Sequence, residues 1–152
     1  MHSIATIGYE GATVATFQQA IRDAGIDLVV DVRALASSRR PGFAKTRLAA
    51  NAKEAGAEYL HLRALGTPAE GRAAARAGHH AEMQRIFRQQ LATPEAQEEL
   101  ALAADLVRQG RRICLLCFEA DPAHCHRRIV ASALSALVSM PVVDLFPGDE
   151  DL

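Results

Sequence analysis

Short apolar runs alternate with longer amphipathic stretches along almost the whole chain. The runs have the length and composition of β-strands, and the stretches have the apolar spacing of helices. The apolar runs 28–32 and 113–118 are typical of strands that are buried on both faces. Strands are predicted for residues 4–8, 28–32, 58–62, 113–118 and 142–146.

Capping residues and glycines mark the predicted helix boundaries. Residues 13–24 place their apolar side chains on one stripe and end before Gly25. Farther along, Thr93 can cap a helix whose first position suits Pro94. The glycine-punctuated residues 66–80 are expected to form a loop or a broken helix. Helices are predicted for residues 13–24 and 45–55, on either side of Thr93-Pro94, and for residues 125–139.

This alternation predicts an α/β fold, a three-layer sandwich with a mainly parallel five-stranded sheet. We expect the Rossmann-like strand order 3-2-1-4-5, with a reversal between the first and the fourth strand. In such sheets ligands bind beyond the carboxyl ends of the strands, at the reversal. The polar residues that follow Gly8, Val32 and Cys117 are therefore expected to converge.

Composition and charge narrow the class of protein. Of the 152 residues, 49% are hydrophobic and 23% charged, which excludes disorder, collagen and coiled coil. We expect one domain, residues 1–147, and an acidic tail, residues 148–152. A formal net charge of −1 gives no general attraction to nucleic acid or membranes. Without a membrane-spanning run or a signal peptide, the protein is expected to be cytoplasmic.

The segment between the fourth strand and the last helix carries most of the candidate chemistry. Cys125, His126 and Arg127 are expected in the first turns of a helix, where the helix dipole favours anions and thiolates. Cys125 is thus a candidate nucleophile or part of an anion pocket, or else a small buried residue. Glu119 follows the strand directly and is a candidate catalytic acid or base. Cys117 is either a core residue or a catalytic one.

Further candidates follow the other strands. Asp31 and Arg33 end a buried strand, as a pair that either binds a ligand or merely closes the strand. A turn with two glycines follows the first strand, and His61 ends the third. The residues expected to bind the ligand are Gly8, Tyr9, Glu10, Asp31, Arg33, Arg40, His61, His126 and Arg127.

The loop after the second strand is basic. It contains Arg39, Arg40, Lys45 and Arg47, together with one aromatic residue and no acid. Such a loop is a candidate contact for phosphate or nucleic acid, or alternatively an ordinary solvated surface.

No metal ion and no cofactor are expected. The turn after the first strand matches neither a P-loop nor a dinucleotide-binding fingerprint. His124, Cys125 and His126 are adjacent at a predicted helix start, where side chains diverge by about 100° per residue and cannot all face one ion. The cysteines of a chain without an export signal also argue against a disulfide framework.

Several motifs occur in order along the chain: Thr6-Ile7-Gly8-Tyr9-Glu10-Gly11, Leu28-Val29-Val30-Asp31-Val32-Arg33, Arg40-Pro41-Gly42-Phe43, Tyr59-Leu60-His61-Leu62, and Leu116-Cys117-Phe118-Glu119 followed by Cys125-His126-Arg127. With them the chain resembles the domain-of-unknown-function family 488 over nearly its whole length. The resemblance supports the choice of site residues and implies no reaction, because that family is uncharacterised. Residues 34–38 depart from the family, which commonly has a proline there.

A weaker, topological similarity is to rhodanese-like sulfurtransferases. They also have an Asp-x-Arg element after a buried strand and a catalytic cysteine loop between a strand and a helix. The glycine-containing cradle of that loop is missing here, and a shared topology does not carry function.

The first functional hypothesis is a domain that binds or acts on a small anionic ligand, nucleotide-like or phosphate-bearing. Glu119 would be the acid or base, Cys125 the nucleophile or thiol donor, and Arg33, His126 and Arg127 the anion clamp. One alternative is a nucleic-acid-binding module that uses the basic loop of residues 39–47. Others are rhodanese-like sulfur transfer at Cys125 and a protein-interaction adaptor. The sequence leaves open whether the protein is an enzyme and how it oligomerises.

Overall fold

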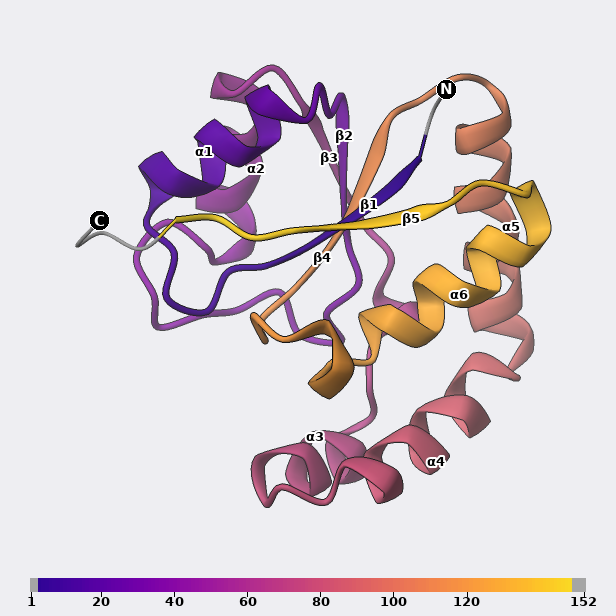
Figure 1. Ribbon diagram of the computed structural model, residues 1–152. Helices are drawn as coiled ribbons and strands as arrows, with labels where there is room; N and C mark the ends of the chain where they lie inside the picture. Colours follow the sequence, from indigo (N-terminus) through magenta and orange to yellow (C-terminus); the bar gives the residue numbers. More distant parts are fainter. Residues whose placement is uncertain (1–2, 149–152) are drawn as a thin grey trace.

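Five parallel strands form the centre of the molecule, and the computed structural model describes residues 3–148 of the chain (Figure 1). The strands are β1 (Ile4–Gly8), β2 (Leu28–Asp31), β3 (Glu58–His61), β4 (Ile113–Cys117) and β5 (Val142–Leu145). The helices are α1 (Val14–Asp23), α2 (Lys45–Glu54), α3 (Ala69–Arg76), α4 (His80–Leu91), α5 (Pro94–Arg108) and α6 (Arg127–Val138). The predicted α/β class and the parallel five-stranded sheet are thereby confirmed. Apart from Gly148, the predicted acidic tail lies outside the described residues.

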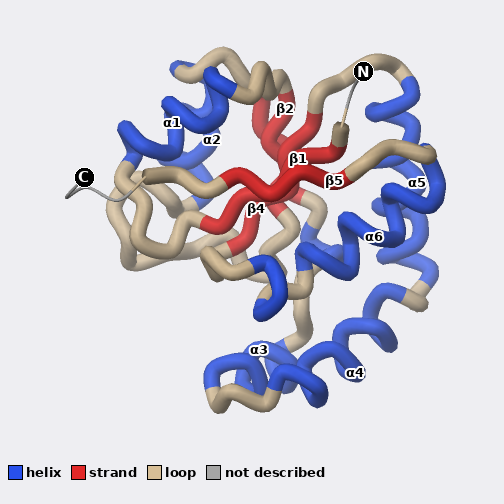
Figure 2. Tube along the Cα trace, viewed as in Figure 1, coloured by secondary structure: helices blue, strands red, loops and turns tan. Residues whose placement is uncertain are grey.

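Helices cover both faces of the sheet (Figure 2). Because side chains alternate along a strand, β4 contributes to two hydrophobic cores. Cys114 and Leu116 belong to the core beneath α1 and α2, and Leu115 and Cys117 to the core beneath α5 and α6. The molecule therefore has the three layers expected from the sequence.

The predicted strand order is wrong. The sheet runs β3-β2-β4-β1-β5, so that β4 lies between β2 and β1 rather than beyond β1. A right-handed crossover fixes which face its helix covers, but it does not fix how many strands the connection skips. All five residues of β4 are buried, whereas Val142 and Val143 of β5 are exposed at the edge.

This order creates two switch points, one on each side of β4. The connections after β1 and β2 lead to α1 and α2 on one face, whereas those after β3 and β4 lead to helices that join the other core. The segments that follow β1 and β2 therefore diverge from the segment that follows β4, and a crevice opens between them. The convergence predicted after Gly8, Val32 and Cys117 takes place here, because Tyr9 N–H donates to Cys117 O and Val32 N–H donates to Leu116 O.

Two helix boundaries differ from the sequence-based expectation. Within residues 66–80 the chain forms the regular helix α3, which lies against α4 beyond the end of the sheet (Figure 1). The last helix starts at Arg127 rather than at residue 125, because Asp121 and Pro122 begin only a single 3-10 turn, Pro122–His124. Cys125 then has an extended backbone that separates this turn from α6.

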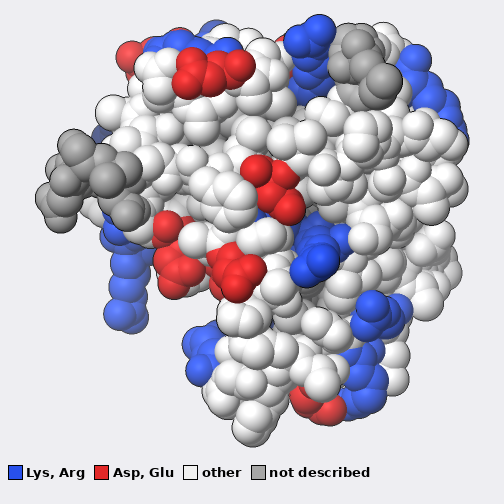
Figure 3. All heavy atoms as spheres, in the orientation of Figure 1, with Lys and Arg blue, Asp and Glu red and all other residues white. Residues whose placement is uncertain are grey.

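Within the described range, no helix is both long enough and apolar enough to cross a bilayer. The surface of Figure 3 shows Lys and Arg interspersed with Asp and Glu on the face that it displays.

Candidate functional site

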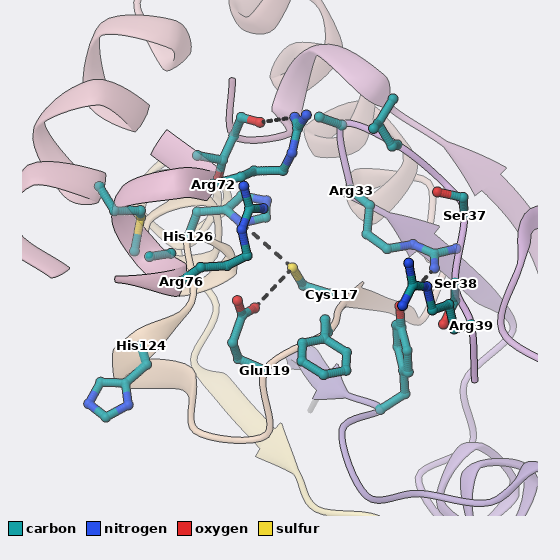
Figure 4. Close-up of a pocket in the computed structure, with 17 residues that line it drawn as sticks. Arg33, Ser37, Ser38, Arg39, Arg72, Arg76, Cys117, Glu119, His124 and His126 are labelled. Carbon is teal, nitrogen blue, oxygen red and sulfur yellow. Dashed lines mark hydrogen bonds between the residues drawn. The ribbon is translucent and has the colours of Figure 1, made fainter. Parts of the chain in front are cut away.

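A pocket with a cavity of about 510 Å³ opens beyond the carboxyl ends of β1, β2 and β4 (Figure 4). Its walls come from the segments after these three strands and from α3 and α4. The polar side chains that line it are those of Tyr9, Arg33, Ser37, Ser38, Arg39, Thr67, Arg72, Arg76, Cys117, Glu119, His124 and His126. The site thus assembles residues from four separate parts of the sequence.

One wall is built around a buried ion pair. Arg33 donates from Nε to Asp31 at 2.9 Å and from its second terminal nitrogen at 2.7 Å, and its backbone N–H donates to the same carboxylate. The other terminal nitrogen of Arg33 donates to Tyr9 Oη and to Phe43 O. Tyr59 Oη completes the cluster with a 2.5 Å bond to Asp31. Every donor group of the Arg33 side chain has a partner within the protein.

The electrostatics of this wall follow from burial and pairing. Burial alone would lower the pKa of Arg33, but the hydrogen bonds and charge of Asp31 outweigh it and raise that pKa. Burial and the hydrogen bond to Asp31 also raise the pKa of Tyr59 well above its ordinary value. Arg33 therefore stays protonated in its buried position beside Asp31.

Aromatic side chains give the same wall an apolar surface. The Tyr9 ring stacks on Phe43 with centroids 4.6 Å apart, and Phe118 meets Tyr9 edge-on at 5.4 Å. Phe118 remains 43% exposed at the mouth of the pocket. Tyr9 and Phe43 are buried, so Phe118 is the ring of this cluster against which a flat organic group could bury apolar surface.

At the base of the pocket two thiols surround one imidazole, a group that we call the thiol–imidazole centre: Cys117, Cys125 and His126. Cys117 Sγ lies 3.6 Å from His126 Nδ1, and Cys125 Sγ lies 3.9 Å from the same nitrogen. Glu119 adds a carboxylate oxygen 3.6 Å from Cys117 Sγ (Figure 4). His126 Nε2 lies 2.7 Å from Val32 O, which ties the centre to the end of β2.

The groups of this centre shift one another's pKa values. Burial alone would raise the pKa of Cys125, but the hydrogen bond from Cys117 and the positive charges of His126 and Arg127 lower it well below the ordinary thiol value. The hydrogen bond to Cys125, together with burial, raises the pKa of Cys117. Burial would lower the pKa of His126, but the neighbouring Cys125 thiolate raises it.

Glu119 differs from an ordinary surface carboxylate. Burial and the nearby charge of Cys125 raise its pKa to about 7. Such a carboxyl group can hold or release a proton at neutral pH, as a catalytic acid or base must. It faces the cavity together with Cys117 and His126, whereas Cys125 is not among the lining residues.

The loop that carries Glu119 is fixed by hydrogen bonds from a buried arginine. Arg127 is completely buried and donates to Glu119 O, Ala120 O and Thr6 Oγ1. Gly8 allows this approach, because a Cβ there would lie 1.7 Å from Glu119 O. Arg127 and Gly8 therefore position the loop and do not line the pocket, although both were expected to bind the ligand.

The remaining predicted residues also lie outside the lining. Glu10 accepts a hydrogen bond from Ala120 N–H, and Arg40 donates to the backbone of Ala12. His61 Nε2 contacts Arg33 O at 2.7 Å. Glu10, Arg40 and His61 thus brace the segments that form the pocket. Among the predicted ligand-binding residues, the lining contains only Tyr9, Arg33 and His126.

Two lining arginines escaped the sequence analysis. Arg72 and Arg76 are spaced by one helical turn in α3, which places them on the same face. Their four-residue spacing within an alanine-rich segment was the available signal. It was missed because three glycines favoured a loop there.

The premise of the geometric argument against a metal ion was wrong, although His124 indeed does not face the same point as Cys125 and His126. It placed His124, Cys125 and His126 on one helix, but the backbone of Cys125 is extended and α6 begins after His126. His124 stacks on His80 instead, with centroids 4.2 Å apart. Cys125 and His126 therefore reach the same space as Cys117.

The parallel sheet, with a crevice at its strand ends and titratable groups gathered there, defines the protein as an α/β domain. The chain belongs to the family described as Domain of unknown function DUF488, which matches residues 13–134. This confirms the resemblance seen in the sequence motifs. No curated protein and no solved structure matches the chain, so the similarity to rhodanese-like sulfurtransferases has no support.

Proposed function

We propose that the pocket binds a small organic anion, phosphate-bearing and nucleotide-like in size. The observation that carries this proposal is the charge of the lining. Four arginines face the cavity, of which only Arg33 is paired with an acid, Asp31, and Glu119 is the one carboxylate among the described lining residues. Such an excess of cationic side chains around a cavity favours an anionic ligand.

Three of these arginines are available to form an ion pair with a bound anion. Within residues 3–148, neither Arg39, Arg72 nor Arg76 has a carboxylate oxygen within 4.0 Å. Arg72 uses one terminal nitrogen for Thr67 O, and its other donors are not engaged by described protein atoms. A guanidinium fork matches the oxygens of a phosphate or carboxylate, and such charge-assisted pairs are strong.

The apolar part of the lining supports an organic ligand rather than a bare inorganic ion. Tyr9, Phe118, Leu35 and Met83 line the same cavity as the arginines. A volume of about 510 Å³ lies within the range of small-molecule sites. Phe118 and the α3 arginines line one cavity, so a ligand with an aromatic ring and an anionic group could contact both.

Glu119, Cys117 and His126 are the groups that would act on a bound ligand, since they face the cavity. Cys125 is only 3% exposed and lies outside the lining, which disfavours direct sulfur transfer from its thiol. In this proposal Cys125 acts through its neighbours His126 and Cys117.

The test is calorimetric titration with inorganic phosphate, adenosine and AMP. AMP should bind more tightly than either of the others, because it alone engages both the apolar wall and the arginines. In the variant R72Q/R76Q the affinity for AMP should fall by about 10-fold or more, as expected when one or two charged hydrogen bonds are lost. The matched control is R88Q, since Arg88 is exposed on α4 and lies outside the lining.

Equal binding of AMP by both variants, or no binding of phosphate and AMP by the wild type, would contradict the proposal. Adenosine that binds as well as AMP would show that the arginines do not recognise the anionic group.

Nucleic acid is the less favoured partner, because the basic loop does not form one continuous strip. Arg39 faces the pocket, Arg40 is tied to Ala12, and only Lys45 and Arg47 project freely at the start of α2. The test is binding of a single-stranded oligonucleotide. Binding that weakens steeply with salt and is abolished in K45Q/R47Q would favour the nucleic-acid alternative instead.

A further inference from the structure

We propose that Cys117, Cys125 and His126 bind a zinc ion at the base of the pocket, with a fourth coordination position open toward the cavity. This inference rests on the thiol–imidazole centre alone and does not depend on which anion the pocket binds. It assigns these three side chains a role as metal ligands, through Sγ of each cysteine and Nδ1 of the histidine.

The distances fit one tetrahedral ion. The three candidate ligand atoms all lie within 4.8 Å of one another. Zn–S bonds of about 2.3 Å and Zn–N bonds of about 2.0–2.1 Å at tetrahedral angles separate S from N by about 3.6 Å. The observed separations from His126 Nδ1 are 3.6 Å to Cys117 Sγ and 3.9 Å to Cys125 Sγ. Both sulfur-to-nitrogen separations are thus close to those of a tetrahedral zinc site.

The imidazole is held in the orientation that ligation requires. His126 Nε2 lies 2.7 Å from Val32 O, a carbonyl that can only accept, so Nε2 carries the proton. In the neutral ring, Nδ1 then presents its lone pair to the two sulfur atoms. Metal-binding histidines characteristically donate their second ring N–H to such a backbone carbonyl.

The backbone around the centre also suits a metal site. Cys117 ends β4, Cys125 lies in the extended residue before α6, and His126 caps that helix. Three polar side chains of 3–6% exposure therefore converge from different elements. Cys114 provides the contrast, since it lies in the opposite core and belongs to no group of three possible metal ligands within the described residues.

The fourth position faces the pocket. Cys117 and His126 line the cavity, and a Glu119 oxygen lies 3.6 Å from Cys117 Sγ on that side. Zinc held by three protein ligands characteristically keeps a water or substrate in its fourth position, and Cys2His is one such ligand set. Glu119 lies where it could hydrogen-bond that water or replace it.

The experiment uses the full chain, reduced with a phosphine and freed of metal by a chelator that is then removed. After Zn²⁺ is added back, native mass spectrometry should show one Zn²⁺ per chain. Co²⁺, used as a spectroscopic probe, should give thiolate-to-cobalt charge-transfer absorption and the intense visible bands of a tetrahedral ion, and Zn²⁺ should displace both.

Variants C117S, C125S and H126Q should each lower the Zn²⁺ affinity by more than about 100-fold, beyond the loss typical of an outer-sphere partner. The matched control C114S should keep full affinity, and circular dichroism verifies that each variant is folded. The wild-type cobalt spectrum does not depend on whether the variants fold.

Three results would overturn the proposal. The wild type could bind no stoichiometric Zn²⁺, Co²⁺ could give no thiolate charge-transfer band, or C114S could lose the metal as completely as C117S. A Cys117–Cys125 disulfide that forms in air in a protein that takes up no metal when reduced would identify a redox dithiol instead. AMP titration of the metal-free protein tests the anion-binding proposal separately.

Discussion

The two arginine-bearing walls of the pocket differ in how their charges are used. On the β2 wall, Arg33 is 6% exposed and each of its three side-chain nitrogens donates to Asp31, Tyr9 or Phe43. On the α3 wall, Arg72 and Arg76 face the cavity without a carboxylate partner among the described residues. Asp31 neutralises the charge of Arg33, so the β2 wall is a structural framework. The charges of Arg72 and Arg76 remain available to an anionic ligand.

This difference shows that an arginine in a motif is not evidence of ligand binding. The Asp31-Val32-Arg33 element is conspicuous in the sequence because burying such a pair requires precise partners. The partners of this buried pair fix the shape of the β2 wall. The arginines free to contact a ligand lie in an alanine-rich helix with no recognisable motif.

The largest effect is expected from D31N, which should unfold the β2 wall. It leaves the Arg33 guanidinium buried without a counter-charge, and breaking a buried pair in this way costs about 3–5 kcal/mol of unfolding free energy. Urea denaturation monitored by circular dichroism measures the loss. The control D105N breaks an exposed pair with Arg108 and should cost no more than about 0.5 kcal/mol. Similar losses in the two variants would mean that the Asp31 cluster does not support the fold.

A smaller loss is expected from Y59F, which removes one donor to Asp31 and leaves the ion pair intact. Hydrogen bonds to charged groups contribute about 1.5–3 kcal/mol, and we expect the lower end because Arg33 continues to donate. The raised pKa of Tyr59 gives a second measurement. Since the folded state retains the phenol proton, this contribution is complete below about pH 10 and declines at higher pH. A tyrosine absorbance step below pH 10 that Y59F removes would contradict the assignment.

The smallest effect, of opposite sign, is expected from R76Q. Arg72 and Arg76 are like charges at positions i and i+4 of α3, an arrangement that destabilises a helix by about 0.2–0.5 kcal/mol. Removing one charge should therefore slightly stabilise the protein at low salt, and the gain should vanish at high salt. A thermal-melting series in sodium chloride tests this. A clear loss of stability in R76Q would show that the α3 wall is a framework like the β2 wall.

The secondary structure and the strand ends could be predicted from the sequence because they depend on local patterns. Thr93 caps α5 and Pro94 occupies its first position, as expected, and α1 begins directly after Thr13, where a helix start was predicted. We could predict that the segments after Gly8 and Cys117 meet, because parallel strands end at the same edge of the sheet. Several different strand orders would preserve this contact. Glu119 and Cys117 could be placed in the pocket for the same reason.

The strand order and the surroundings of Cys125 could not be predicted, because they depend on non-local packing. The position of β4 between β2 and β1 is set by burial of its two faces in separate cores, which no local pattern encodes. Asp121 and Pro122 do begin a helical turn, as the sequence indicates. That turn is a single 3-10 turn, however, and not the start of α6. A shift of the helix start by two residues moved Cys125 off the helix and toward Cys117.

The close approach of Gly8 to the Glu119 carbonyl bears on how this sequence can change during evolution. The carbonyl occupies the space of a residue-8 side chain, and the Arg127 guanidinium holds it there. A larger residue at position 8 becomes tolerable only if the loop moves, and the loop moves only if residue 127 releases it. We therefore expect substitutions at these two positions, which are 119 residues apart in the chain, to occur together among related sequences.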